Sequence, residues 1–195
     1  MPTKTTALAR RTLRALMIML ASLAVYTALD LGTKEWALYH LSRERPGDTP
    51  ALCIPDELGH TPFQRLALEP RPLIPGVINL NYAENCGAAF SIMRTAPAFV
   101  RASVFGVATV GAVFVLMMMF LRGSGGRAFA AAVPLIASGA IGNLGDRLRH
   151  GFVVDFFQVD PHLFKYPVFN VADIAIAIGV GLLLIDTARV KPSSR

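Results

Sequence analysis

Two aspartates in the C-terminal third of the chain have surroundings that suit acid–base chemistry. Asp173 is the single charged residue of the apolar stretch 166–185, and Asp155 lies among the apolar residues of 152–157 with no basic neighbour. A charged group at the centre of a membrane helix costs on the order of 3 kcal/mol, so such residues are typical of functional sites. Apolar surroundings raise a carboxyl pKa, and two carboxyls that share one proton supply both a base and an acid. The pattern predicts a pair formed by Asp155 and Asp173.

Asp146 is the second candidate partner for Asp173. It adjoins Arg147 and shares a helical face with Asn143, three residues before it. An ion pair with Arg147 is expected to keep Asp146 ionised, so Asp155 suits a shared proton better. From the residues alone, these aspartates could instead form a proton relay, join helices or lie at the membrane surface.

Four apolar stretches must position these carboxyls. The chain has 195 residues, of which 53% are apolar and 16% charged, a composition typical of an integral membrane protein. A helix rising about 1.5 Å per residue needs roughly 20 residues to cross the hydrocarbon core. We therefore expect a mainly α, integral membrane fold, a single domain over 1–195, with four transmembrane helices at about 15–33, 100–121, 128–146 and 167–188.

The basic residues lie at the ends of the apolar stretches and not on one face, so the net charge of +6 does not indicate nucleic-acid binding. Cytoplasmic ends of spans carry such residues. We expect both termini on the cytoplasmic side of the membrane, with the candidate pair near the outer face. The residues concerned are Lys4, Arg10, Arg11, Arg14, Arg122, Arg127, Arg189, Lys191 and Arg195.

The outer segment of about 42–98 divides into two parts. Residues 46–75 hold seven of the 13 prolines and are expected to form an irregular loop. Residues 77–82 approach the alternation of a strand, which predicts a small extramembrane β element. Cys53 and Cys86 both fall in this segment, where one bridge is conceivable, but we expect two free thiols. The four histidines are scattered, so no metal site is predicted.

Four blocks of residues together resemble the bacterial lipoprotein signal peptidase (signal peptidase II) family. They are DLGTK at 30–34, NCGAAF at 85–90, GAIGNLGDR at 139–147 with VVDF at 153–156, and FNVAD at 169–173. The blocks appear in the family's order and cover about 30–190. Cys86 departs from the small polar residue usual there, and the Pro-rich stretch of about 43–75 is longer than the family's pattern.

The resemblance implies a membrane aspartic endopeptidase that cleaves prolipoproteins before a diacylglyceryl-modified cysteine, without metal or organic cofactor. Its partners would be these substrates and membrane lipids, and we expect a monomer. Asp155 and Asp173 match the family's catalytic pair. The positions matching residues that line or support the site are Asp30, Lys34, Asn85, Gly87, Asn143, Asp146, Arg147, Asn170 and Ala172.

Simpler roles remain open for several supporting residues. Asp30 and Lys34, four residues apart, are equally well explained as an interfacial helix pair. Gly139 and Gly142 favour close helix packing over substrate contact, and Asn85 could form a turn. Two other function classes compete: a proton-coupled transporter, which predicts ionisable residues throughout the membrane depth, and a non-enzymatic scaffold, which leaves the polar blocks unexplained.

Overall fold

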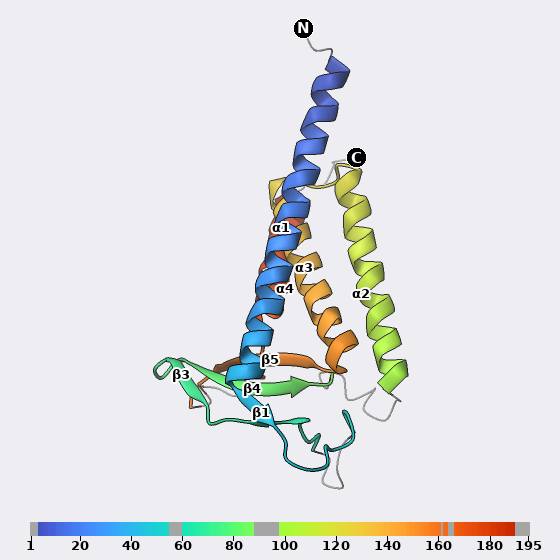
Figure 1. The fold of residues 1–195 in the computed structure, drawn as a ribbon. Helices are drawn as coiled ribbons and strands as arrows, with labels where there is room; N and C mark the ends of the chain where they lie inside the picture. The colour runs from blue at the N-terminus through green and yellow to red at the C-terminus, as the bar shows by residue number, and fades with distance from the viewer. Residues whose placement is uncertain (1–3, 55–59, 88–97, 161, 164–165, 190–195) are drawn as a thin grey trace.

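A computed structural model of the chain describes residues 4–54, 60–87, 98–160, 162–163 and 166–189. Over these residues the chain forms four helices and five short strands, which confirms a mainly helical fold with a small β element. The strands gather at one end of the bundle, opposite the start of α1 and the end of α4 (Figure 1). The elements are α1 (Lys4–His40), β1 (Ser42–Glu44), β2 (Arg65–Ala67), β3 (Arg71–Ile74), β4 (Ile78–Asn85), α2 (Ala98–Leu121), α3 (Arg127–His150), β5 (Val153–Val159) and α4 (Val171–Arg189).

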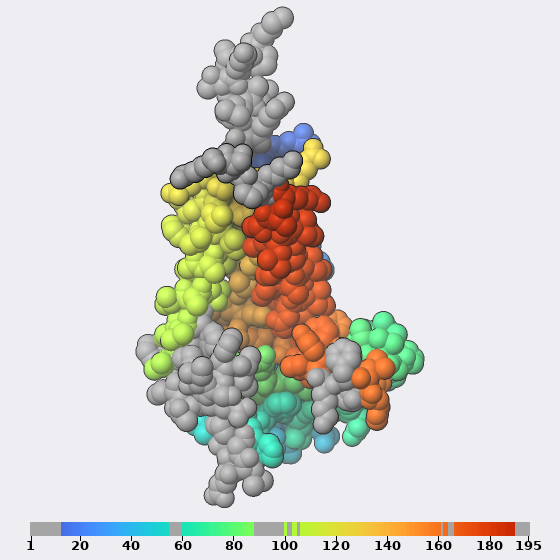
Figure 2. All heavy atoms as spheres, turned by 180° about the vertical axis from the view of Figure 1, so that it is seen from behind, coloured from blue at the N-terminus to red at the C-terminus, as the bar shows by residue number. Residues whose placement is uncertain are grey.

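Within the described ranges, three helices are long and apolar enough to cross a membrane: Leu13–His40, Arg127–His150 and Val171–Arg189. The described apolar part of α2, Gly106–Leu121, is shorter. Figure 2 shows the surfaces of α2 and α4 side by side on one face of the bundle. Large apolar side chains cover these surfaces, such as Val107 on α2 and Leu184 on α4. Such exposed apolar faces suit contact with lipid, as expected for a membrane protein.

Helix α3 packs against the other three helices, and small residues allow it to approach α4 closely. A Cβ on Gly139 would lie 2.5 Å from the backbone oxygen of Ala172, and one on Gly179 would lie 2.5 Å from the Ile136 side chain. A Cβ on Gly142 would overlap the Asp30 carboxylate. The packing interpretation of Gly139 and Gly142 is therefore confirmed, since glycine lets neighbouring helices come this near.

The main sheet is antiparallel with the order β3-β4-β5, and β1 pairs with β2 in a separate two-stranded sheet. The expected strand at 77–82 is confirmed and continues to Asn85. The prediction of an irregular loop over 46–75 is wrong where β2 and β3 form. No strand was predicted after α3, but the β-branched and aromatic residues there form β5.

A buried apolar cluster joins the C-terminal end of α1 to the sheet. Because side chains alternate along a strand, Val154 and Phe156 on β5 face this cluster, while Asp155 between them faces the opposite way. Phe152, Val154 and Phe156 are all at most 4% exposed. The members are Ala37, Leu38, Leu41, Cys53, Tyr82, Phe152, Val154 and Phe156.

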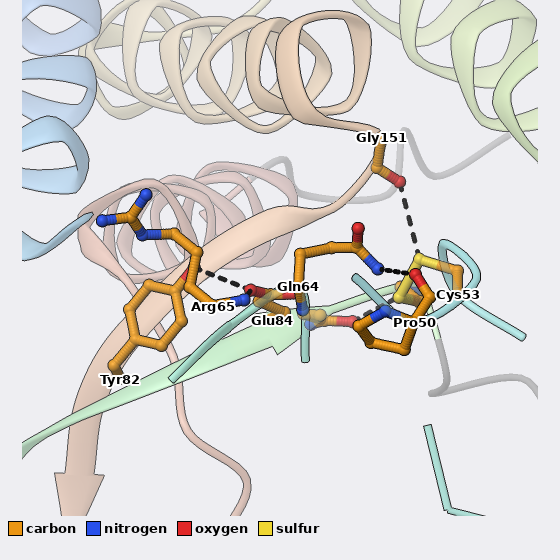
Figure 3. The surroundings of a disulfide bond; sticks show 10 residues. Pro50, Cys53, Gln64, Arg65, Tyr82, Glu84 and Gly151 are labelled. Atoms are coloured by element: carbon orange, nitrogen blue, oxygen red, sulfur yellow. Dashed lines mark hydrogen bonds between the residues drawn. A yellow bond between two sulfur atoms is a disulfide. The ribbon is translucent and has the colours of Figure 1, made fainter. Parts of the chain in front are cut away.

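Cys53 and Cys86 form a disulfide, with a Cα–Cα distance of 5.6 Å (Figure 3). The expectation of two free thiols is wrong. The two cysteines are 33 residues apart in the chain, and only the return of the Pro-rich segment to the end of β4 brings them together. Sequence spacing does not show such a contact.

Candidate active site

Asn170 and Asp173 cap the N-terminus of α4 reciprocally. The Asn170 side-chain oxygen accepts a hydrogen bond from the Asp173 backbone N–H at 3.0 Å, and the Asp173 carboxylate accepts one from the Asn170 backbone N–H at 3.2 Å. This is the geometry of a capping box, in which the N-cap and the third helical residue satisfy each other's free N–H groups. The N-x-x-D spacing therefore holds the Asp173 side chain at the N-terminus of α4.

The fourth helix begins later than its apolar stretch suggests. The expected span begins at about 167, but α4 begins at Val171. The preceding residues instead join the sheet: the Phe169 backbone oxygen accepts hydrogen bonds from the N–H groups of Phe156 and Phe157 at 3.0 and 2.8 Å. Asp173 consequently lies in the first helical turn of α4.

Asp155 is held by two asparagines from different parts of the chain. The Asn170 side-chain amide donates to one carboxylate oxygen of Asp155 at 2.6 Å, and the Asn85 amide donates to the other at 3.0 Å. Asp155 lies on β5 opposite Ala83 of β4 and is 2% exposed. Asn85 ends β4, so the sheet register brings it to the same face as Asp155.

Asn143 of α3 connects the two aspartates to α1. Its side-chain amide donates to Asp173 at 3.0 Å, and its oxygen accepts hydrogen bonds from Asn170 at 3.2 Å and from the Lys34 ammonium at 2.7 Å. One side chain therefore contacts three other site residues from two helices and the cap of α4. A network in which polar groups satisfy one another holds its members rigidly in a site with little water.

Asp30 and Lys34 of α1 form a buried ion pair with 2.8 Å between the charged atoms, and they are 1% and 2% exposed. The Asp30 carboxylate also accepts a hydrogen bond from the Ala172 backbone N–H at 2.8 Å. Lys34 lies 3.6 Å from Asp146 of α3. The predicted pair of Asp30 and Lys34 is therefore present, and it is buried inside the protein, where it ties α1 to α3 and α4.

Asp146 contacts groups well beyond its neighbour Arg147. Asp146 accepts a hydrogen bond from the Val154 backbone N–H at 2.9 Å and faces Lys34. Arg147 donates to the Asn143 backbone oxygen at 3.1 Å and interacts electrostatically with both Asp155 and Asp173 as well as with Asp146. Adjacent helical residues point about 100° apart, so they reach different partners.

The electrostatics of the site favour retention of a proton. Four carboxyl groups face two cations in the described network: Asp30, Asp146, Asp155 and Asp173, with Lys34 and Arg147. Burial, and then the charge of Asp173, raise the pKa of Asp155 to about 7. The hydrogen bonds from Asn85 and Asn170 and the charge of Lys34 act in the opposite direction. The expected rise of the Asp155 pKa through desolvation is confirmed, but the side chains that contact Asp155 are polar.

The remaining predicted residues support the site through the backbone. Gly87 donates its N–H to the Asn85 side-chain oxygen at 2.9 Å and has a φ of 82°, which glycine adopts without strain. Its contact sets the direction of the Asn85 amide, so Asn85 is more than a turn former. Ala172 contributes the N–H that binds Asp30. The rest of the second block, Ala88, Ala89 and Phe90, lies outside the described residues.

The arrangement has the parts needed for general acid–base chemistry. Asp155 and Asp173 belong to separate elements, yet both bind Asn170 and interact electrostatically with each other. One proton shared by such a pair leaves one carboxyl group as an acid and the other as a base. A water molecule between them could be activated for attack on a carbonyl carbon.

The sequence of this chain matches one protein family. The model of a family described as signal peptidase (SPase) II matches residues 22–189. A lipoprotein signal peptidase of Photorhabdus laumondii is 38% identical over 164 residues, which cover 84% of this chain and 83% of that relative. One from Yersinia enterocolitica is 32% identical over 158 residues, covering 81% of this chain and 79% of the relative.

A solved structure has a similar fold. It is described as a bacterial membrane enzyme determined by the in meso method at 2.3 Å resolution. It superposes with a TM-score of 0.65 and 23% sequence identity, over 91% of this chain and 94% of the other. At this identity the likeness concerns the fold alone.

Proposed function

Because the chain belongs to the signal peptidase II family and removes signal peptides from prolipoproteins, we propose that it does so as an aspartic endopeptidase with Asp155 and Asp173 as its catalytic pair. The observation that carries this proposal is the position of Asn170. Its side chain donates to Asp155, while its own backbone N–H and side-chain oxygen bind Asp173. One residue thus joins the two carboxyl groups.

In the proposed reaction, the carboxylate of the pair takes a proton from a water molecule as its oxygen attacks the scissile carbonyl. The protonated carboxyl group gives its proton to the carbonyl oxygen, which forms a neutral tetrahedral intermediate. Collapse of this intermediate breaks the C–N bond, and a proton passes to the leaving nitrogen. The pKa of Asp155, raised to about 7, supports Asp155 as the group that carries the shared proton.

The substrate is a membrane-anchored precursor, and we propose cleavage on the amino side of its diacylglyceryl-modified cysteine. The site lies where α4 begins and the sheet meets the helices, at the end of the bundle away from the start of α1 (Figure 1). All four helices cross the membrane with both termini cytoplasmic, which puts the pair near the outer face of the inner membrane. The basic residues at the opposite end support this orientation.

The supporting residues hold the pair in place and shield it. Lys34 and Arg147 balance the negative charge of the site, and the asparagines orient the carboxylates. Asn85 and Asn170 occupy both Asp155 oxygens with N–H donors, which suits water activation by carboxyl groups better than metal binding. We propose that the enzyme needs no cofactor and works as a monomer.

The test is cleavage of a purified diacylglyceryl-modified precursor, with the products identified by mass spectrometry. The wild type is expected to give a product that begins with the lipid-modified cysteine, at the same rate in the presence of a metal chelator. A scissile bond elsewhere, or activity lost to the chelator and restored by a metal, would contradict the proposal.

A further inference from the structure

Strand β4 has two functional faces. Side chains alternate along a strand, so Tyr82, Glu84 and Cys86 point one way while Ala83 and Asn85 point the other. The first face contacts the Pro-rich segment through Glu84 and the disulfide at Cys86. The second face contacts Asp155 through Asn85. The outer segment is therefore attached to the residues on either side of the asparagine that binds the catalytic carboxyl group.

Glu84 forms the first attachment. Glu84 is 8% exposed, and its carboxylate accepts hydrogen bonds from the backbone N–H groups of Gln64 and Arg65 at 2.7 and 3.0 Å. The Tyr82 hydroxyl donates to it at 3.0 Å. Burial, and then the charge of Glu84, raise the pKa of Tyr82, so the phenol remains a donor. Gln64 in turn donates to the Pro50 backbone oxygen at 2.8 Å, near the disulfide (Figure 3).

The disulfide forms the second attachment. Cys53 is 4% exposed and adopts a φ of 56°, a left-handed conformation that is costly for a non-glycine residue unless its surroundings hold it. Its sulfur lies 3.7 Å from the Gly151 backbone oxygen, as Figure 3 shows. Gly151 caps α3 and leads directly into β5. The bridge therefore joins the residue after β4 to Cys53, which in turn contacts the turn that starts the strand bearing Asp155.

We propose that the Cys53–Cys86 disulfide is a positioning element for the proposed peptidase reaction, because it holds Asn85 against Asp155 and so makes full activity depend on the oxidised form. The inference rests on the proposed function of Asp155. Neither cysteine touches the carboxyl pair in the described contacts; the bridge acts through Asn85, which is the residue before Cys86.

Reduction is the direct way to remove the bridge. Dithiothreitol donates two electrons and two protons to the disulfide, which becomes two thiols, while the reagent forms its own cyclic disulfide. The chain has two cysteines, so no other thiol responds. In detergent micelles, reduction is expected to lower kcat roughly tenfold with little change in KM, because a catalytic group loses its exact placement. Reoxidation should restore the rate.

The pH profile separates positioning from general loosening of the fold. Asn85 donates to the Asp155 carboxylate, and this hydrogen bond opposes the rise of its pKa. Loss of the contact should move the alkaline limb of the kcat/KM profile to higher pH by about half to one unit. Partial unfolding would lower kcat/KM at every pH without moving the alkaline limb of the profile. The matched control is the double variant Cys53→Ser/Cys86→Ser, whose rate and profile should resemble the reduced wild type and should not respond to dithiothreitol.

A double-mutant cycle tests the route through Asn85. Asn85→Ala should slow the oxidised enzyme, and reduction should then cost this variant little more, because the contact is already absent. Unchanged rate and profile on reduction of the wild type, or independent effects of reduction and Asn85→Ala, would overturn the inference. Failure of the proposed function is distinguishable, because it would appear as full activity of an Asp155→Asn variant in the oxidised state.

Discussion

The Asn170 side-chain amide donates a hydrogen bond of 2.6 Å to the Asp155 carboxylate, the shortest link between α4 and β5 among the described side-chain contacts of the site. Because Asn170 is also the N-cap of α4, the same residue starts the helix and orients the proposed pair. Local helix chemistry and catalysis therefore depend on one side chain.

Substitution of Asn170 separates these two roles. Serine caps helices about as well as asparagine, but its hydroxyl is too short to reach Asp155. Asn170→Ser should keep the cap, lower the free energy of unfolding less than Asn170→Ala does, and lower kcat/KM by roughly 100-fold. Asn170→Ala should lose both activity and the cap. Equal cleavage rates for Asn170→Ser and the wild type would show that the Asp155 contact is dispensable.

The pH dependence of activity should report the raised pKa of Asp155. With a value of about 7, Asp155 carries its proton below neutral pH and loses it as the pH rises. kcat/KM should therefore fall on the alkaline side of pH 7, as the pair loses its shared proton. A profile that stays flat from pH 6 to about 9 would be inconsistent with this assignment.

The same pKa makes a prediction about stability that does not require activity. A carboxyl group whose pKa is raised from 3.8 in the unfolded chain to about 7 binds its proton more tightly in the folded state. Its contribution to stability is fully present below 3.8 and is lost as the pH rises through about 7. The thermal midpoint of the wild type minus that of Asp155→Asn should therefore decrease as the pH rises over this window. A difference independent of pH would contradict the prediction.

Lys34 should be essential for folding more than for chemistry. Lys34→Met leaves Asp30 and Asp146 buried without their shared cation, and breaking a buried pair typically costs about 3–5 kcal/mol. The change is measured as a loss of thermal stability in micelles. Asp30→Asn added to Lys34→Met should recover part of this loss, because one uncompensated charge is removed. If stability did not recover, charge compensation of Asp30 would not be the role of Lys34.

Gly142 tests the close packing of α3 against α1. A Cβ there would overlap the Asp30 carboxylate, so Gly142→Ala should destabilise the protein by about 1–3 kcal/mol. Gly111→Ala in α2 is the matched control, since no atom of the described residues outside its own helix backbone lies within 4 Å of its Cβ position. Thermal unfolding of the two variants compares them directly, and equal midpoints would show that α1 and α3 adjust without cost.

The features that the sequence predicts well are those determined by local composition. Long apolar stretches predict helices because a helix satisfies all its backbone groups within one segment in lipid. The apolar neighbours of Asp155 correctly predict its desolvation. Alternating residues likewise predict β4, although its end at Asn85 depends on pairing with β5.

The features that sequence reasoning missed depend on contacts between distant segments. Strand β5 forms because Val153–Val159 pairs with β4, and the start of α4 is delayed because Phe169 pairs with β5. Asp146 lies close to Lys34, more than 100 residues earlier in the chain. The cysteines meet only after the Pro-rich segment folds back. None of these partners follows from spacing along the chain.

The most direct test of the catalytic pair is single-turnover cleavage of the lipid-modified precursor by two isosteric variants, Asp155→Asn and Asp173→Asn. Each should insert into the membrane and lower the rate by about 10³-fold or more, because an amide cannot exchange the proton. Asp48→Asn, an exposed position on the Pro-rich segment, should cleave at the wild-type rate. Wild-type cleavage by either variant of the pair would contradict the account.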